Sequence, residues 1–211
     1  MSDLANWIAP ARTALVIVDM QVDFASPEGV LGEAGVDMRV VEPALAAAQR
    51  LADAARAAGT PVVFVGLQTR TAFDSQAWRL RMARRGGDPD AEIALCRAGE
   101  PGADFYGPTP LVDELVVPKT RYSGFFGTPL DAALKAKGVD TLVVCGVTTD
   151  CCVDCTVRDA FHLDYHVFIA GDACASYDRD MHEGTLKALD LNFAIVTDSG
   201  AVATAWGASH G

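Results

Sequence analysis

Short apolar runs recur along the chain and are separated by stretches in which apolar residues return every three or four positions. A continuous apolar run is typical of a strand that is buried on both faces of a parallel sheet. The first run, at residues 14–18, is the clearest, because five apolar residues in a row end at a single aspartate, Asp19. We predict six such strands, at residues 14–18, 61–65, 114–117, 141–145, 166–170 and 193–196.

The stretches between these runs predict helices. Pro43 fits the first turn of a helix whose apolar positions have helical spacing, and Gly59 fits its end. We expect further helices near residues 128–138, 152–163, 180–190 and 199–206, and irregular structure at 20–35 and 68–110. Strands that alternate with helices indicate an α/β fold, with a doubly wound (Rossmann-like) parallel sheet and helices on both faces. We find no linker or repeat, so residues 1–211 are predicted to form a single domain.

Charge and composition narrow the class of partner. The formal net charge is −11, which argues against nucleic acid or an anionic membrane as a partner. No apolar run approaches the ~18 residues of a membrane span, and the first ten residues lack the pattern of a signal peptide. Six cysteines in 211 residues are too few for a disulfide scaffold, so we expect reduced thiols and a cytoplasmic protein.

Three polar residues fall at the carboxyl ends of predicted strands. They are Asp19, Lys119 and, just past the fourth strand, Cys152. The carboxyl ends of parallel strands share one edge of the sheet, so the three side chains can converge. Taken singly, each has an ordinary structural interpretation: a turn former, a surface charge and a small buried side chain. Together they form a pattern that is far more specific than any member.

The chemistry of a thiol supports the joint pattern. A cysteine nucleophile needs a base within hydrogen-bond reach, a nearby cation, or both. Histidine is an unsuitable base here, because His162 lies far along its predicted helix and His166 begins a strand at the opposite edge of the sheet. We therefore predict that Asp19 is the base and that Lys119 stabilises the thiolate.

Three cysteines crowd the turn after the fourth strand. Cys151 lies in the turn and Cys155 lies nearly one turn into the following helix, whereas Cys152 is best placed at the helix start. A helix N-terminus favours the thiolate form of such a cysteine. The N–H of Cys152 and an N–H from the turn, which we assign to Thr148, are predicted to form an oxyanion hole.

The long stretch from residue 68 to residue 110 is predicted to hold substrate ligands. Arginine offers a planar fork of donors for a carboxylate or ureido oxygen, and we expect one or two arginines to serve in this way. The others fit a solvated loop or an oligomer contact, and the nearby aromatic residues fit core packing equally well. The candidates are Gln68, Arg70, Trp78, Arg79, Arg81, Tyr122 and Phe125.

Three motifs occur in a fixed order, VIVDMQVDF at residues 16–24, PKTRYSGFF at 118–126 and GVTTDCCV at 146–153. In these motifs, and over residues 13–196, the chain resembles the isochorismatase-like cysteine hydrolase superfamily. The resemblance implies a sheet of order 3-2-1-4-5-6 and an Asp19–Lys119–Cys152 triad. It also implies a cis peptide bond between Val147 and Thr148, which would turn the Thr148 N–H toward the oxyanion. Members are commonly homodimers or homotetramers.

The middle of the chain separates the members of this superfamily. Nicotinamidases carry a metal site with one Asp and two His after the second strand, whereas the first histidine here is His162. We therefore expect no metal and no cofactor. Residues 119–131 are similar to those of ureidoacrylate amidohydrolases, and the WRLR stretch at 78–81 is similar to that of biuret hydrolases.

We expect hydrolysis of the C–N bond of a small ureido or carbamoyl compound through an acyl-thioenzyme, with that amide and water as the reactants. Several alternatives stay open. An N-carbamoylsarcosine- or maleamate-type amidase would use the same triad. Vinyl ether hydrolysis of isochorismate would not need Cys152. A non-enzymatic binding protein would keep the fold with a degenerate site.

Overall fold

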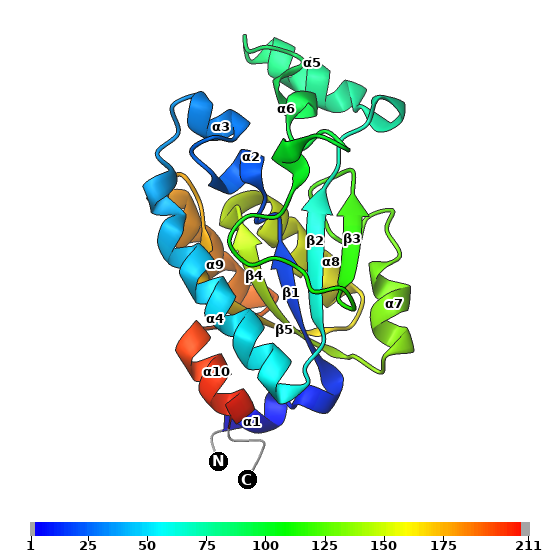
Figure 1. Cartoon of the computed structure of the whole chain (residues 1–211), viewed down its shortest axis with the longest axis vertical. Coiled ribbons are helices and arrows are strands. Elements are labelled where there is room, and N and C mark those ends of the chain that lie inside the picture. The colour runs from blue at the N-terminus through cyan, green and yellow to red at the C-terminus, as the bar shows by residue number, and fades with distance from the viewer. Residues whose placement is uncertain (1–2, 208–211) are drawn as a thin grey trace.

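Six parallel strands form one sheet in the computed structural model, which describes residues 3–207. The strand order is β3-β2-β1-β4-β5-β6, which confirms the predicted fold and the order that the resemblance implies (Figure 1). The strands are β1 Thr13–Val18, β2 Val62–Leu67, β3 Leu115–Lys119, β4 Thr141–Val147, β5 His166–Ala175 and β6 Ile195–Thr197.

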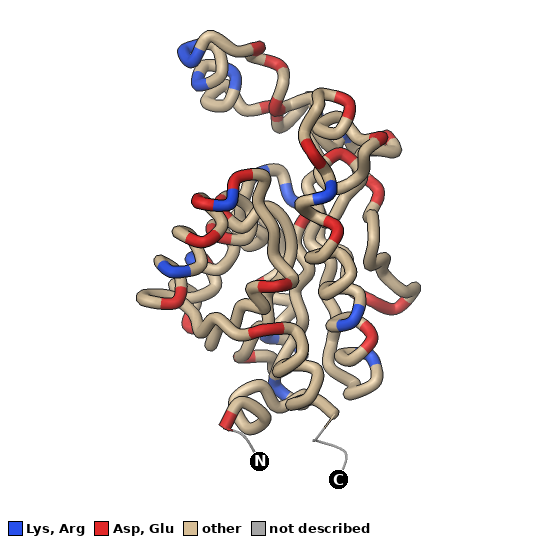
Figure 2. Tube along the Cα trace, turned by 90° about the vertical axis from the view of Figure 1, so that its left-hand side faces the viewer, with Lys and Arg blue, Asp and Glu red and all other residues tan. Residues whose placement is uncertain are grey.

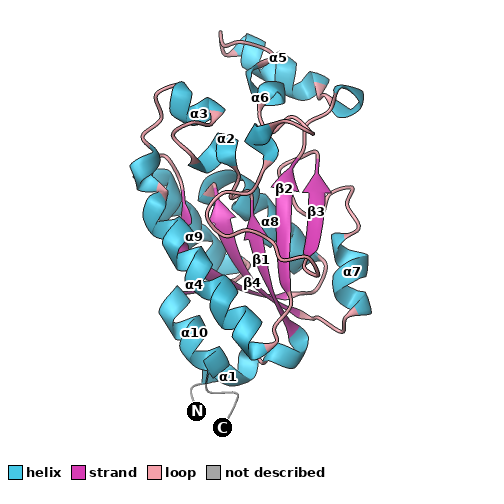
Figure 3. Ribbon diagram, viewed as in Figure 1, coloured by secondary structure: helices cyan, strands magenta, loops and turns pink. Residues whose placement is uncertain are grey.

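Helices cover both faces of this sheet (Figure 3). Helices α4 and α10 lie side by side on one face, and α8 and α9 pack on the other. The helices are α1 Asp3–Trp7, α2 Val22–Ala25, α3 Val30–Glu33, α4 Glu42–Ala58, α5 Gln76–Arg84, α6 Ala91–Ala94, α7 Leu130–Ala136, α8 Asp154–His162, α9 Arg179–Asn192 and α10 Ser199–Gly207. None of these helices is long and apolar enough to cross a membrane.

Helix α4 shows how the sequence pattern produces the core. Its buried side includes Leu45 and Leu51, and burying a leucine side chain stabilises a fold by about 1.5–3 kcal/mol. Pro43 lies in its first turn, and Gly59 ends it in the left-handed conformation at φ 71°. That conformation suits a residue without Cβ, so both ends of the predicted helix are confirmed.

A close contact between β1 and β4 sets the start of the turn after β4. Gly146 has φ 137°, and a Cβ at this position would overlap the carbonyl oxygen of Val18. Only glycine fits there. The register between β4 and β5 also shifts between Val144 and Gly146, so the chain leaves the sheet with an altered direction.

Two stretches predicted as irregular contain helices. Residues 68–110 include α5 and α6, which form a cap beyond the carboxyl ends of β2 and β3 (Figure 1). Helix α5 begins because the Ser75 hydroxyl accepts a hydrogen bond from the Trp78 N–H, and Trp78 is its only buried residue. A nine-residue helix with one buried side chain has no apolar stripe, so its spacing does not predict it. Helices α2 and α3 have four residues each and likewise lack a stripe.

Several strand ends also differ from the prediction, and β2, β3 and β4 each end two residues later. Strand β5 continues to Ala175, past the end predicted at residue 170. Strand β6 begins at Ile195, two residues later than predicted, because Phe193 and Ala194 close the end of α9 through hydrogen bonds to the Leu189 carbonyl.

Candidate active site

Asp19, Lys119 and Cys152 converge at the carboxyl edge of the sheet, as predicted. Asp19 follows β1, Lys119 ends β3, and Cys152 lies in the turn after β4. Asp19 and Lys119 are fully buried and Cys152 is 6% exposed. Strand β2 separates β1 from β3, and the long lysine side chain spans that distance.

Lys119 is the centre of the cluster. Its Nζ lies 2.7 Å from Asp19 Oδ2 and donates a hydrogen bond to Cys152 Sγ at 3.3 Å. A second hydrogen bond goes to the carbonyl oxygen of Arg121 at 3.0 Å. An ammonium group has three N–H donors, so each one has a partner. The lysine therefore has a single well-defined position between the carboxylate and the thiol.

Two contacts fix the Asp19 carboxylate. Its backbone has φ 50°, in the left-handed region that aspartate tolerates better than most residues. Its Oδ1 accepts a hydrogen bond of 2.9 Å from the Leu67 N–H at the end of β2. Gln21 holds Leu67 in turn, because its side chain bonds both the N–H and the carbonyl of that residue. The carboxylate is thus anchored to the neighbouring strand.

Burial and neighbouring charges shift the pKa values of Asp19 and Lys119 in opposite directions. Burial raises the pKa of Asp19, although the charge of Lys119 opposes the shift. Burial alone would lower the pKa of Lys119, but the nearby Asp19 and Cys152 outweigh it and raise that pKa. The lysine therefore stays charged, and its charge is matched by one negative charge on Asp19 or Cys152.

The surroundings of the Cys152 thiol favour its protonated form. A hydrogen bond with Cys151, burial and the Asp19 charge raise the pKa of Cys152 well above the usual range of a thiol. Lys119 opposes this shift but does not reverse it. A thiolate at this position therefore requires transfer of the proton to a base, and Asp19 is the carboxylate within reach.

The neighbouring cysteines have different surroundings. Cys151 is partly exposed and lines the cavity described below. Cys155 lies in the first turn of α8, and burial raises its pKa to about 11. Lys119 donates to Cys152 and to neither of these two within the described part of the chain. The geometry thus distinguishes Cys152 from its neighbours.

The turn that carries Cys152 is a single π-helical turn, Thr149–Val153, and α8 begins after it at Asp154. Cys152 therefore precedes the helix by two residues rather than starting it. The Thr156 hydroxyl donates to the Cys152 carbonyl at 2.7 Å and ties the turn to α8. The peptide bond between Val147 and Thr148 is cis, as the resemblance implies.

A small cavity of about 170 Å³ opens above Cys152. Trp78 and Tyr122 stack on one side of it with ring centroids 5.1 Å apart. Glu92, on α6, accepts a hydrogen bond from the Tyr122 hydroxyl and forms an ion pair with Arg81. The lining residues are Phe24, Leu31, Leu67, Trp78, Glu92, Leu95, Tyr122, Val147, Thr148, Cys151, Cys152 and Tyr177. Ligand cavities for drug-sized molecules measure about 300–1,000 Å³, so this one fits a smaller compound.

The structure brings some of the predicted substrate ligands to this cavity. Trp78 and Tyr122 line it, and Arg81 reaches it indirectly through Glu92. Of the oxyanion residues, Val147 and Thr148 line it beside Cys152. The role of each as a ligand stays a prediction.

Four other candidates lie elsewhere. Gln68 and Arg70 line a separate polar groove, where the two side chains hydrogen-bond to each other. Arg79 pairs with Asp90 on the cap surface. Phe125 packs in the core against Tyr165. These four residues therefore lie away from the cavity, and the expectation that one or two of the arginines bind the substrate stays a prediction. The segment forms a helical cap, and only one face of it points at the site.

Sequence reasoning missed Glu92 and Tyr177. Tyr177 lies two residues beyond β5, so the strand-end rule that located Asp19 would have found it with the correct end of β5. Glu92 lies in a four-residue helix, and no pattern in the sequence marks it.

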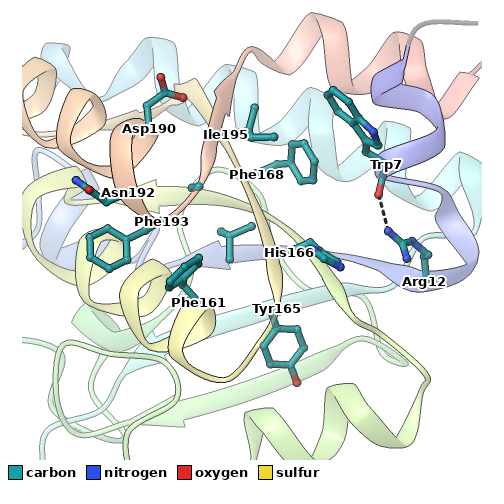
Figure 4. A pocket seen from close by; sticks show the side chains of 12 residues that line it. Trp7, Arg12, Phe161, Tyr165, His166, Phe168, Asp190, Asn192, Phe193 and Ile195 are labelled. Atoms are coloured by element: carbon teal, nitrogen blue, oxygen red, sulfur yellow. Dashed lines mark hydrogen bonds between the residues drawn. The ribbon is translucent and has the colours of Figure 1, made fainter.

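A second cavity, of about 470 Å³, lies at the amino edge of the sheet (Figure 4). Its walls are largely aromatic, with Trp7, Phe161, Phe168 and Phe193, and His166 is among its lining residues. The triad lies at the opposite edge, so this cavity is separate from the candidate site. The position of His166 agrees with its exclusion as a base.

Within residues 3–207, no group of three or more His, Cys, Asp or Glu side chains could hold a metal ion. Cys152, Asp19 and Lys119 bring a thiol, a carboxylate and an ammonium group together at the candidate site. That combination can perform nucleophilic attack with general acid–base catalysis.

Comparisons with known proteins agree with the fold and identify the family. Residues 13–201 match the isochorismatase domain model. The ureidoacrylate amidohydrolase RutB of Methylobacterium radiotolerans is 37% identical over 94% of this chain and 81% of that protein. RutB of Acinetobacter baylyi is 33% identical over 92% of this chain and 84% of its own length.

Solved structures resemble the whole fold. A cysteine hydrolase from Pseudomonas syringae pv. phaseolicola superposes with a TM-score of 0.83 and 28% identity, over 97% of this chain and 96% of that one. N-carbamoylsarcosine amidase from Thermoplasma acidophilum superposes with a TM-score of 0.71 and 27% identity, over 89% and 96%. With a family model that spans most of its length, the chain belongs to the isochorismatase family.

Proposed function

We propose that the protein is a cysteine-dependent amidohydrolase that cleaves the C–N bond of a small ureido or carbamoyl compound. The observation that carries the proposal is the placement of Lys119 Nζ between Asp19 and Cys152, at 2.7 and 3.3 Å. The ion pair between Lys119 and Asp19 does not need the Cys152 sulfur for its stability, so a structural role does not explain the contact. It does provide a base, a cation and a nucleophile in one place.

The first half of the reaction forms an acyl-thioenzyme. Asp19 takes the proton of the Cys152 thiol, and the sulfur attacks the carbonyl carbon of the substrate. The N–H groups of Thr148 and Cys152 stabilise the oxyanion. When the tetrahedral intermediate collapses, the C–N bond breaks and Asp19 returns the proton to the departing nitrogen.

The second half regenerates the thiol. A water molecule attacks the acyl carbon, and Asp19 takes one of its protons. The C–S bond then breaks, the acid leaves, and Asp19 returns the proton to Cys152. Lys119 stays protonated throughout and stabilises the negative charge on whichever of Asp19 and Cys152 carries it.

Two observations support a ureido or carbamoyl substrate. The relatives described above are ureidoacrylate amidohydrolases at 33% and 37% identity, and one structural neighbour is an N-carbamoylsarcosine amidase. The cavity of about 170 Å³ accommodates a compound of that size rather than a peptide. We also propose a cytoplasmic homodimer or homotetramer, which is the common state in the superfamily that the sequence resembles.

The test compares cysteine variants in one assay. Ammonia release from biuret and ureidoacrylate is measured for the wild type, Cys152→Ala and Cys151→Ala. We expect Cys152→Ala to lose activity by at least about 10³-fold, because it removes the nucleophile. Cys151→Ala is the matched control, since it lines the same cavity without contacting Lys119, and it should keep at least a tenth of the activity. Full activity in Cys152→Ala would refute the assignment.

A further inference from the structure

We infer that Glu92 makes the site selective for substrates whose end remote from the cleaved bond is uncharged and carries N–H donors. Ureido compounds with a carboxylate at that end, ureidoacrylate among them, are disfavoured, and in this the protein would differ from the relatives named for that compound. The inference rests on the proposed amidohydrolase function, and it divides ureido compounds into two classes by charge.

The charged groups around the cavity favour a neutral substrate. Of the twelve side chains that line it, Glu92 alone bears a formal charge in the resting state. Lys119 lies beneath Cys152, fully buried, and its charge is matched by Asp19. Among the lining side chains a substrate therefore meets a carboxylate and no ammonium or guanidinium group, since Arg121, which lies 5.3 Å from the Trp78 ring centroid, is not one of them.

Arg81 does not provide a positive charge inside the cavity. It lies on α5 and pairs with Glu92 from the outer side, with 46% of its side chain exposed against 20% for Glu92. Its charge is already neutralised, and it is not among the lining residues. A substrate carboxylate could bind Arg81 only by displacing Glu92 from the pair.

Two of the three hydroxyl groups that line the cavity are already used as donors. The Tyr122 hydroxyl donates to Glu92 Oε2 at 3.2 Å. The Tyr177 hydroxyl donates to the Phe24 carbonyl at 2.6 Å. Much of the remaining wall is apolar, including Phe24, Leu31 and Leu95. The Thr148 hydroxyl is the third, and a single neutral hydroxyl stabilises a bound carboxylate less than a cationic partner does.

Glu92 itself has accepting capacity to spare. A carboxylate has about four lone-pair positions, and Arg81 and Tyr122 occupy two of them. The amide N–H groups of a neutral substrate can use the others. A hydrogen bond to a charged acceptor is stronger than one between neutral groups, so the contact favours such a substrate.

The experiment compares 3-ureidopropionamide with 3-ureidopropionate, which share the ureido group and differ in charge at the far end. Cleavage is followed by chromatography of the released amines. For the wild type we expect kcat/KM to be at least 10-fold higher for the amide. Glu92→Gln removes the negative charge and frees Arg81, so the ratio should fall at least 10-fold.

Asp90→Asn is the matched control. It removes the same charge from the same cap, where Asp90 pairs with Arg79 outside the cavity. The ratio should keep its wild-type value in this variant. A wild type that prefers the acid, or an unchanged ratio in Glu92→Gln, would overturn the inference.

Binding to Cys152→Ala, measured by calorimetry, separates this inference from the proposed function. Tighter binding of the amide than of the acid supports the selectivity even if neither compound is cleaved by the wild type. In that case it is the amidohydrolase proposal that fails. Equal binding of the two, tighter binding of the acid, or no binding of either rejects the role of Glu92.

Discussion

Lys119 and Asp19 form an ion pair that is fully buried, and each residue depends on the other for its charge. Removing one member of such a pair leaves the other charge unpaired in the interior, which costs about 3–5 kcal/mol. We therefore expect Lys119→Met to lower the free energy of unfolding by about that amount. The double variant Asp19→Asn/Lys119→Met should recover most of it, because neither charge remains. Urea denaturation at pH 8 measures both.

The pH dependence gives this prediction a second readout. The pKa of Asp19 is already raised by burial, and Lys119 is a group that lowers it, so removing the lysine raises it further. A carboxyl group whose folded pKa exceeds its unfolded value loses stability as the pH rises through that range. The destabilisation of Lys119→Met should therefore be smaller at pH 5 than at pH 8. A loss that does not vary with pH, or a double variant no more stable than the single one, would contradict the prediction.

At the scale of residues, the sequence predicted what depends on strand ends. Asp19, Lys119 and Cys152 each follow a run that is unmistakably a strand, so their convergence could be inferred from topology alone. The position of Glu92 could not be predicted in this way, because it depends on how the cap folds over the sheet. That arrangement is set by tertiary contacts rather than by local spacing.

At the scale of elements, Asp23 joins the cap to the sheet. Its Oδ2 accepts a buried hydrogen bond of 2.6 Å from the Cys96 N–H, and its Oδ1 accepts one of 3.1 Å from the Val30 N–H. Gly102 allows this approach, since a Cβ there would overlap the carboxylate. The segment that Asp23 holds also carries Glu92 and Leu95 into the cavity.

We expect Asp23→Ala to cost about 1–3 kcal/mol, because it leaves a buried N–H without a partner. The same change should raise KM several-fold, since the cap wall of the cavity loses its anchor. Asp23→Asn keeps one accepting oxygen and should lose less in both measurements. Urea denaturation and steady-state kinetics test the two effects. If Asp23→Ala were destabilised with an unchanged KM, the carboxylate would hold the fold but not the cavity.

The helices show where sequence patterns stop being informative. Helix α4 was predicted with both of its ends, because seventeen residues with one apolar face leave a clear period. Helix α5 was not, because it buries a single tryptophan and its start depends on the Ser75 cap. Short helices that belong to a cap rather than packing on the sheet have too few apolar positions to be predicted from the sequence.

At the scale of the whole molecule, the sequence predicted a doubly wound sheet but did not by itself order the strands. Alternating strands and helices fit several strand orders, and the order 3-2-1-4-5-6 came from the resemblance. The substrate-facing cap comes from residues 68–110, which we predicted to be irregular. The framework of the site was therefore predictable, and its selectivity was not.

The net charge of −11 makes the whole molecule repel itself. Acidic residues are spread over the chain, whereas several basic residues gather on the α5 end (Figure 2). Salt screens this repulsion, since the Debye length falls from about 30 Å at 0.01 M to about 8 Å at 0.15 M. We expect Tm at neutral pH to rise by a few degrees between these ionic strengths. Near the sequence pI of 4.6 the net charge vanishes, so the rise should disappear. Calorimetry at both pH values measures it, and an equal rise at pH 4.6 would show that salt acts by another route than screening.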